Sequence, residues 1–104
     1  MSSIIAVQLD AVAALARELA VLAAELGDAT DLCRSAAGSL STALGGDEGW
    51  AAGAAAAAWA GLSALVAADA RAVAGTLDAA VTDYRAADAL RADWISRGAL
   101  AAAR

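Results

Sequence analysis

The chain contains one cluster of strong helix breakers, and this cluster lies close to the midpoint. It reads Gly45-Gly46-Asp47-Glu48-Gly49-Trp50, and an uninterrupted helical pattern lies on each side of it. Glycine readily adopts the left-handed conformation that ends many helices, so Gly45 and Gly46 are expected to end the first helix. Asp47 is then placed to cap the second helix, and Glu48 falls in its first turn, where negative charge is favourable.

This single break predicts an all-α fold in which two long antiparallel helices of similar length form a helical hairpin. At 104 residues the chain corresponds to one domain. The first helix is expected over about 8–44, the turn over 45–49, the second helix over about 50–95 and a tail from there to 104. Helices of this length predict a rod of roughly 50 Å. The residues that we assign to the turn region are Gly45, Gly46, Asp47, Trp50 and Gly53.

Large apolar residues follow a heptad pattern in the first half of the chain. Every seventh residue belongs to one row, and a second row is interleaved with it, which is the signature of a coiled-coil seam. The first row is Ile5, Val12, Leu19, Leu26, Cys33 and Leu40, and the second is Leu15, Leu22, Ala29, Ala36 and Ala43. The core residues shrink towards the turn, from leucine to alanine and cysteine. Either the helices approach each other more closely there, or a bulky residue from elsewhere fills the space.

The second half follows a different spacing. Its apolar row approximates an eleven-residue repeat, which predicts a nearly straight helix. This row consists of Trp59, Leu62, Val66, Ala70, Val73, Leu77, Val81, Tyr84 and Asp88. A separate row of small residues at intervals of four would allow another backbone to come close. It consists of Gly49, Gly53, Ala57 and Gly61.

A hairpin this thin buries only one strip between its helices, so it is marginal alone and needs a partner. We expect it to form a homodimer, or a heterodimer with another helical hairpin, and thereby a four-helix bundle. Further apolar residues off the seams, such as Leu32, Leu65 and Trp94, can supply a second docking face. The expected partner interface is Leu15, Leu19, Leu22, Leu26, Trp59, Leu62, Val66, Val73 and Leu77.

Composition excludes several classes of partner. The formal net charge is −5, which argues against nucleic acid and anionic membranes, because both select basic patches. All seven basic residues are arginine, which is typical of a GC-rich bacterial genome. The first ten residues lack the positive region and long apolar run of a cleavable signal peptide. The uncharged stretch 49–68 is long enough to span a membrane, but its alanines and glycines gain little from lipid, so we expect no stable span.

Few residues suit catalysis or ligand binding. The chain has no histidine and no lysine, so the usual general base and Schiff-base nucleophile are missing. A single cysteine is a poor basis for a metal site, and we expect no catalytic residue, metal or cofactor. For Cys33 we favour packing as a small apolar residue over a disulfide across a symmetric dimer.

Tyr84-Arg85-Ala86-Ala87-Asp88 is the second informative feature, because residues four apart share one face of a helix. Taken alone, the pair fits a tyrosine that closes the open end of a hairpin beside the carboxylate where burial stops. A short Ala-rich chain, folded once near Trp and Gly and bearing Tyr-x-x-x-Asp late in its second helix, resembles the WXG-type substrates of type VII secretion. The closer likeness is to the EspC-like branch, at Val7-Gln8-Leu9-Asp10 and from Trp59 to Asp88.

The resemblance implies export without a cleavable signal peptide, to the medium or the cell envelope. It implies that Tyr84 and Asp88 belong to a secretion signal read by the secretion ATPase, with 89–104 as the adjoining tail. Family members commonly act as dimers of hairpins without enzymatic activity. The sequence departs from the family at the turn, where Trp50-Ala51-Ala52-Gly53 has one residue more than Trp-x-Gly. This departure agrees better with the EspC-like branch.

Two other readings remain open from the sequence. An intracellular adaptor or chaperone for a larger toxin or enzyme would explain the hairpin and its apolar residues equally well, but not the Tyr-x-x-x-Asp motif. A filament-forming structural protein would use the row of small residues beginning at Gly49 for contacts between copies.

Overall fold

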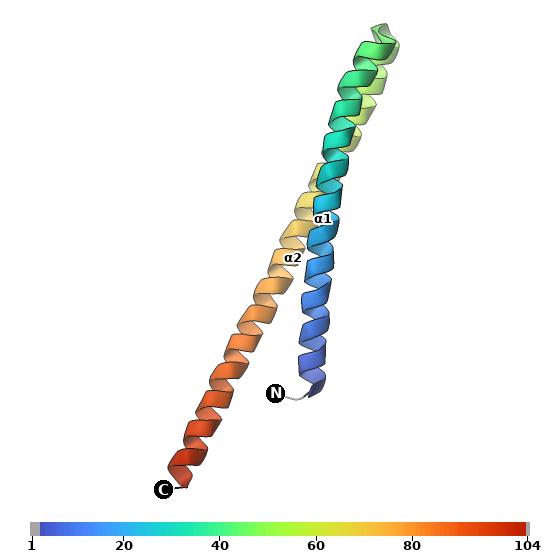
Figure 1. The fold of residues 1–104 in the computed structure, drawn as a ribbon. Helices are drawn as coiled ribbons and strands as arrows, with labels where there is room; N and C mark the ends of the chain where they lie inside the picture. The colour runs from blue at the N-terminus through green and yellow to red at the C-terminus, as the bar shows by residue number, and fades with distance from the viewer. Residues whose placement is uncertain (1–2, 104) are drawn as a thin grey trace.

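The computed structural model describes residues 3–103 and forms a two-helix hairpin. Helix α1 spans Ser3–Leu44 and helix α2 spans Gly46–Ala102. The two helices run antiparallel, as Figure 1 shows, which confirms the all-α hairpin. They are not of similar length, because α1 has 42 residues and α2 has 57. The rod measures 87 × 17 × 13 Å and is longer than predicted, because α1 already begins at Ser3 and α2 continues as helix to Ala102.

The turn is shorter than the predicted 45–49 and consists of Gly45 alone. Gly45 and Gly46 both have positive φ, at 65° and 53°, as expected for the residues that reverse the chain. The amide of Gly49 donates to the carbonyl of Gly45 over 2.8 Å and closes the first turn of α2. Asp47 is therefore not the cap, because Gly45 holds that position without a side-chain hydrogen bond. Trp50 likewise lies in the second turn of α2 rather than at its start.

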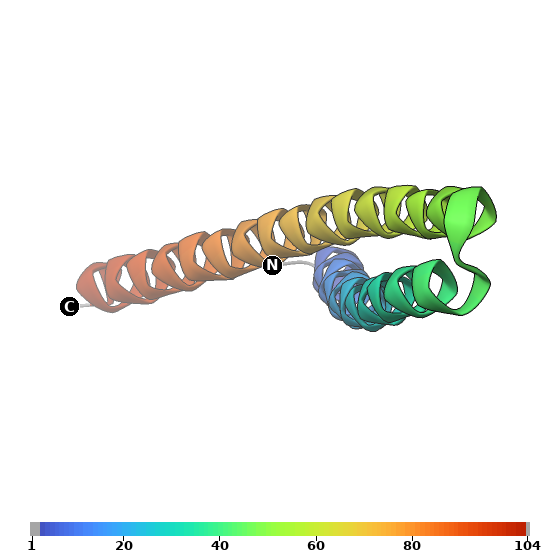
Figure 2. The same cartoon turned by 90° about the horizontal axis from the view of Figure 1, so that it is seen from above.

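The seam between the helices is built from small residues. The buried residues of α1 and α2 recur at intervals of seven, so α2 follows a heptad and not the predicted eleven-residue repeat. A heptad repeat makes helices wind around each other, and Figures 1 and 2 show this winding. Within residues 3–103 no buried side chain is larger than valine. The central seam residues are Ala16, Ala23, Thr30, Gly53, Ala60, Ala67, Ala74 and Val81.

Apart from Val81, which is buried, the large apolar residues expected in the seam lie beside it or outside it. Leu15 and Leu22 are exposed, and the second predicted row of α1 is therefore displaced by one residue from the observed one. In α2, Trp59 is 63% exposed, and Leu62, Val66 and Val73 are exposed as well. The first predicted row of α1 agrees better with the structure, because most of its residues are half-buried. Small residues occupy the centre of the seam because they let the two backbones approach each other. At this separation there is no room for leucine or tryptophan between the helices.

The closest approach occurs beside the turn, which is the first of the two explanations for the shrinking side chains. A Cβ atom added to Gly49 would lie 2.7 Å from the carbonyl oxygen of Ser41, and one added to Gly53 would collide with the Ser41 hydroxyl. The rest of the predicted small-residue row does not take part. Ala57 and Gly61 are exposed, and a Cβ at Gly61 would have nothing within 4 Å. The row at intervals of four therefore meets α1 only at its first two members.

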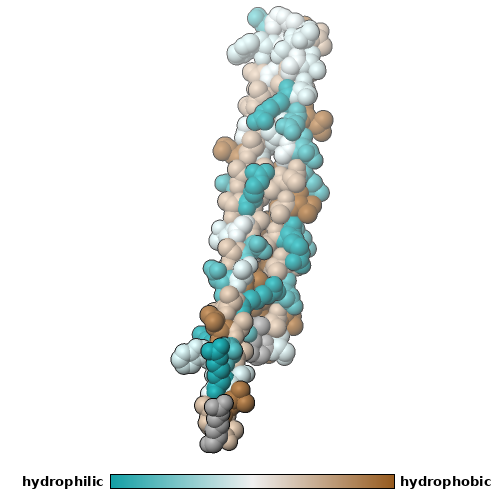
Figure 3. All heavy atoms as spheres, turned by 60° about the vertical axis from the view of Figure 1, so that its left-hand side comes forward, coloured by the Kyte–Doolittle hydropathy of each residue, from teal (hydrophilic) through white to brown (hydrophobic). Residues whose placement is uncertain are grey.

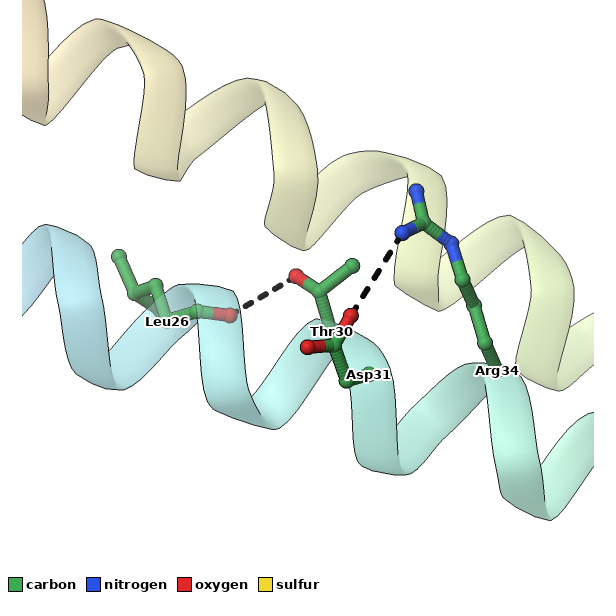
Figure 4. A network of polar contacts seen from close by, with 4 residues as sticks. All are labelled: Leu26, Thr30, Asp31 and Arg34. Carbon is green, nitrogen blue, oxygen red and sulfur yellow. Dashed lines mark hydrogen bonds and ion pairs between the residues drawn. The ribbon is translucent and has the colours of Figure 1, made fainter.

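One polar side chain is buried in the seam of the described residues. Thr30 is 3% exposed, and its hydroxyl donates to the carbonyl of Leu26 over 2.8 Å, one turn earlier in α1 (Figure 4). This local bond satisfies the hydroxyl, so burial leaves no unpaired donor. The neighbouring Asp31 and Arg34 form an exposed ion pair at 3.8 Å on the same helix, which adds little stability.

Candidate interaction surfaces

One face of the hairpin is polar. A hollow of about 310 Å³ between the helices is lined by Arg17 and Ala20 of α1 and by Arg71, Gly75 and Asp78 of α2. A second hollow of about 420 Å³ lies nearer the turn on the same face. Its charged lining residues are Asp28, Asp31, Arg34 and Arg71. We call this surface the polar face.

Helix geometry places the opposite face. The polar-face residues follow a seam alanine by one or four positions: Arg17 and Ala20 follow Ala16, and Gly75 follows Ala74. At 100° per residue, positions one before and three after a seam residue lie on the other side of the helix. The polar-face residues of both helices line one hollow, so these residues lie on the same side of the hairpin. The positions one before and three after the seam residues of α1 and of α2 therefore lie together on the opposite side. We call this second surface the apolar face.

The apolar face is free of charge over most of the rod. Positions one before and three after each seam residue contain no charged residue over 5–43 of α1 and 49–87 of α2. Eight of the nine residues predicted for a partner interface fall on it, and only Leu62 lies further round α2. The eight are Leu15, Leu19, Leu22, Leu26, Trp59, Val66, Val73 and Leu77.

Large apolar side chains are thus a surface feature of this hairpin. Figure 3 shows one view in which hydrophilic side chains run along the rod and strongly hydrophobic ones protrude singly. Among the described residues, no leucine or tryptophan is buried in the seam, where alanine predominates. A rod that places leucine and tryptophan outside and alanine inside presents contact area to another molecule.

Tyr84 and Asp88 lie together at the open end of the hairpin. They line one hollow of about 420 Å³ with Ile5 of α1 and with Arg91, Ala92 and Ile95 of α2. The Tyr84 side chain is 48% exposed, and Asp88 is half-buried. The structure therefore brings the two signal residues predicted from the sequence to one site. The contribution of Ile5 was not predicted, because it depends on how far α1 reaches back along α2.

An ion pair joins the helices beside this hollow. Arg85 Nη2 lies 2.6 Å from Asp10 Oδ1, and both side chains are substantially exposed. Arg85 follows seam residue Val81 by four positions, so the pair belongs to the polar face. This ion pair crosses between the helices, whereas the Asp31–Arg34 and Asp93–Arg97 pairs each lie within one helix. No local spacing in the sequence signals it, since its partners are 75 residues apart.

Beyond the hollow, α2 continues as a single helix past the beginning of α1 (Figure 1). The predicted tail 96–104 is thus helical up to Ala102. Trp94 is 78% exposed, and it lines a shallow apolar hollow with Leu90, Arg91 and Ile95. Segment 89–104 carries three of the seven arginines but one of the twelve acidic residues. The open end is therefore more basic than the rest of an acidic molecule.

The described residues offer little to a ligand. Residues 3–103 contain no group of three or more potential ligand side chains that could hold a metal ion. Cys33 is a free, half-buried thiol beside the seam. By length and composition α2 is apolar enough to cross a membrane, which is weak evidence because core helices meet the same criterion.

Comparisons of the chain with models of known families, with curated proteins and with solved structures found no significant match.

Proposed function

We propose that this chain is a non-enzymatic helical adaptor that pairs with a second helical hairpin and is exported by a type VII secretion system. The observation that carries the proposal is the charge-free apolar face. A hairpin that holds itself together with alanine and glycine gains little from its own seam, since alanine buries little apolar area. Covering the leucine, valine and tryptophan rows with another hairpin would bury much more. The product would be a four-helix bundle.

The second hairpin is either another copy of this chain or a different chain with a similar face. Charge supports this kind of partner, because a face without charged residues suits a partner face of the same kind and offers nothing to nucleic acid. The polar face, with its arginines and aspartates, would remain in water on the outside of the bundle. In this arrangement the apolar face would be buried while the polar face stays hydrated.

The position of Tyr84 and Asp88 supports the export part of the proposal. Their hollow lies at the open-end limit of the apolar face, away from the turn, and Tyr84 retains about half of its surface there. A partly exposed aromatic side chain in a hollow is the type of group that anchors protein recognition. We assign the reading of this site to the secretion ATPase, as the resemblance implies, and the destination to the medium or the cell envelope.

Export of a Tyr84→Ala variant tests this proposal. Truncation of an aromatic anchor typically costs about 2 kcal/mol or more of binding free energy. The ratio of the chain in culture filtrate to that in cell lysate is therefore expected to fall at least about ten-fold. Asp83→Ala is the matched control, because Asp83 is the preceding residue, is exposed and does not line the hollow. Equal export of the Tyr84 variant and the native chain, at equal folded abundance, would contradict the proposal.

The apolar face equally favours a second candidate, an intracellular adaptor or chaperone for a larger toxin or enzyme. This candidate requires the same exposed rows and gives no role to Tyr84. A chain that stays in the lysate, bound to a larger protein in both the native and the Tyr84→Ala form, would establish it instead.

A further inference from the structure

We propose that the first turns of α1 are part of the export signal, with Ile5 forming one wall of the recognised site and the Asp10–Arg85 ion pair holding that wall in place. This inference rests on the proposed function and deepens it. It changes the signal from a motif on one helix to a folded site made from both ends of the chain.

The hollow itself supports a site made from two helices. Five of its lining residues come from α2, and Ile5 of α1 closes it from the other side. Its lining is mixed, because the polar residues Tyr84, Asp88 and Arg91 line it together with the apolar residues Ile5 and Ile95. Such a site fits an apolar side chain of the receptor, flanked by a group that can bond to Tyr84 or Arg91. Without Ile5 the same residues would form an open helix surface.

The start of α1 lies outside the buried part of the seam. No residue from Ser3 to Val12 is buried, and Ala13 is the first that is. Segments with few buried apolar contacts open locally at low cost. The Asp10–Arg85 ion pair, at 2.6 Å, joins the two helices in this region. An exposed ion pair adds little to the free energy of unfolding of a whole protein. Here it favours the docked over the open state of the first turns of α1, and these two states differ little in free energy.

The sequence position of Arg85 strengthens this inference. Arg85 directly follows Tyr84 and lies within the Tyr-x-x-x-Asp motif, so the motif contains its own attachment to α1. Asp10 lies on the polar face, away from the apolar face assigned to the second hairpin. Changing this pair therefore tests the site without touching the pairing surface.

A charge reversal and its rescue test the role of the pair. Asp10→Arg places two arginines opposite each other, and we expect export to fall two- to five-fold while the hairpin stays folded. The double variant Asp10→Arg with Arg85→Asp restores opposite charges and is expected to recover export. A merely structural role predicts no recovery specific to the reversed pair. Hydrogen exchange provides a direct readout, with amides of residues 4–12 losing protection in the single variant and regaining it in the double variant.

A substitution at Ile5 tests the other part of the proposal, that Ile5 forms one wall of the recognised site. Ile5→Glu puts a charge into the hollow, which lies at the open-end limit of the apolar face. We expect it to reduce export more strongly than Asp10→Arg while the mass of the complex with the second hairpin, measured by light scattering, stays unchanged. Ile4→Glu is the matched control, because Ile4 is the same residue type in the same turn, is 70% exposed and does not line the hollow.

The outcomes separate this inference from the proposed function. Loss of export in Tyr84→Ala together with unchanged export in Ile5→Glu and Asp10→Arg would overturn the two-helix site and leave the signal on α2 alone. Unchanged export in Tyr84→Ala would overturn the proposed function itself. Equal losses for Ile4→Glu and Ile5→Glu would also count against a specific wall.

Discussion

At the scale of single residues, the hairpin depends on where side chains are absent. The two helices meet most closely at Gly49 and Gly53, where α2 passes the backbone and side chain of Ser41. A helix interior normally favours alanine over glycine by about 1 kcal/mol. Glycine is kept at these two positions because a methyl group would fall within the neighbouring helix. The sequence alone suggested such a role for four small residues, and geometry restricts it to two.

Substitution of Gly49 by alanine is therefore expected to destabilise the hairpin despite the better helix propensity. The new Cβ would lie 2.7 Å from the Ser41 carbonyl oxygen, so the backbones must move apart. Overpacking of this kind costs typically 1–3 kcal/mol, which leaves a net loss of about 1 kcal/mol. Gly61→Ala is the control with the opposite sign, because its Cβ meets nothing within 4 Å. Urea unfolding followed by circular dichroism measures both, and a stabilised Gly49→Ala would show that the close approach is absent.

At the scale of the helices, the choice of seam decides which residues face outward. The heptad of α1 was recognisable from its leucines, and the single break at Gly45 placed the hairpin correctly. The seam itself was assigned one residue away in part of α1 and to the wrong rows in α2. Sequence patterns weight large apolar residues as the core, whereas this fold puts Ala16, Ala23, Ala60 and Ala67 there. The composition does not reveal which alanines are buried, because alanine is frequent along the whole chain.

The same reason limited the prediction of the site at the open end. Tyr84 and Asp88 were predicted as a pair from their spacing of four residues on one helix and from the family resemblance, and their role stays a prediction. Ile5 and the Asp10–Arg85 pair depend on the register between the helices, which follows from the one-residue turn. A turn of five residues, as predicted, would have shifted that register. Contacts between distant segments are thus the part of this fold that local pattern does not reveal.

A larger side chain in the seam tests the assignment of alanine to the centre. Ala67→Leu is expected to lower the free energy of unfolding by about 1–3 kcal/mol, because leucine has no space between the backbones. Ala68→Leu is the matched control, since the next residue is exposed, and its effect is expected to stay within about 0.5 kcal/mol. Thermal unfolding by circular dichroism compares the two. If Ala67→Leu proves as well tolerated as Ala68→Leu, the seam does not run through Ala67.

At the scale of the whole molecule, the hairpin has two different long faces. Charged residues from both helices gather on the polar face, and the apolar face carries none over 5–43 and 49–87. A rod 87 Å long and 13 Å thick has no interior in which to hide the apolar rows. In the proposed pairing, association removes these rows from water, and the polar face forms the outer surface of the complex.

A charge on the apolar face is expected to break the complex. Leu22→Glu would bury an unpaired carboxylate between two hairpins, at a cost of several kcal/mol, and shift the protein towards single chains. Ala24→Glu introduces the same side chain two residues away on the polar side of α1, where it stays in water and leaves the complex intact. Light scattering after size-exclusion chromatography gives the mass of each. Dissociation by both variants alike would mean that the second hairpin does not prefer the apolar face.

Native mass spectrometry of the complex purified from the cell that produces this chain tests the central claim most directly. The account predicts a species with this chain and one further helical chain, identical or different, that separates when Leu22→Glu is introduced. A folded, stable single chain, with its leucines and tryptophans open to water and no second hairpin at any concentration, would contradict it.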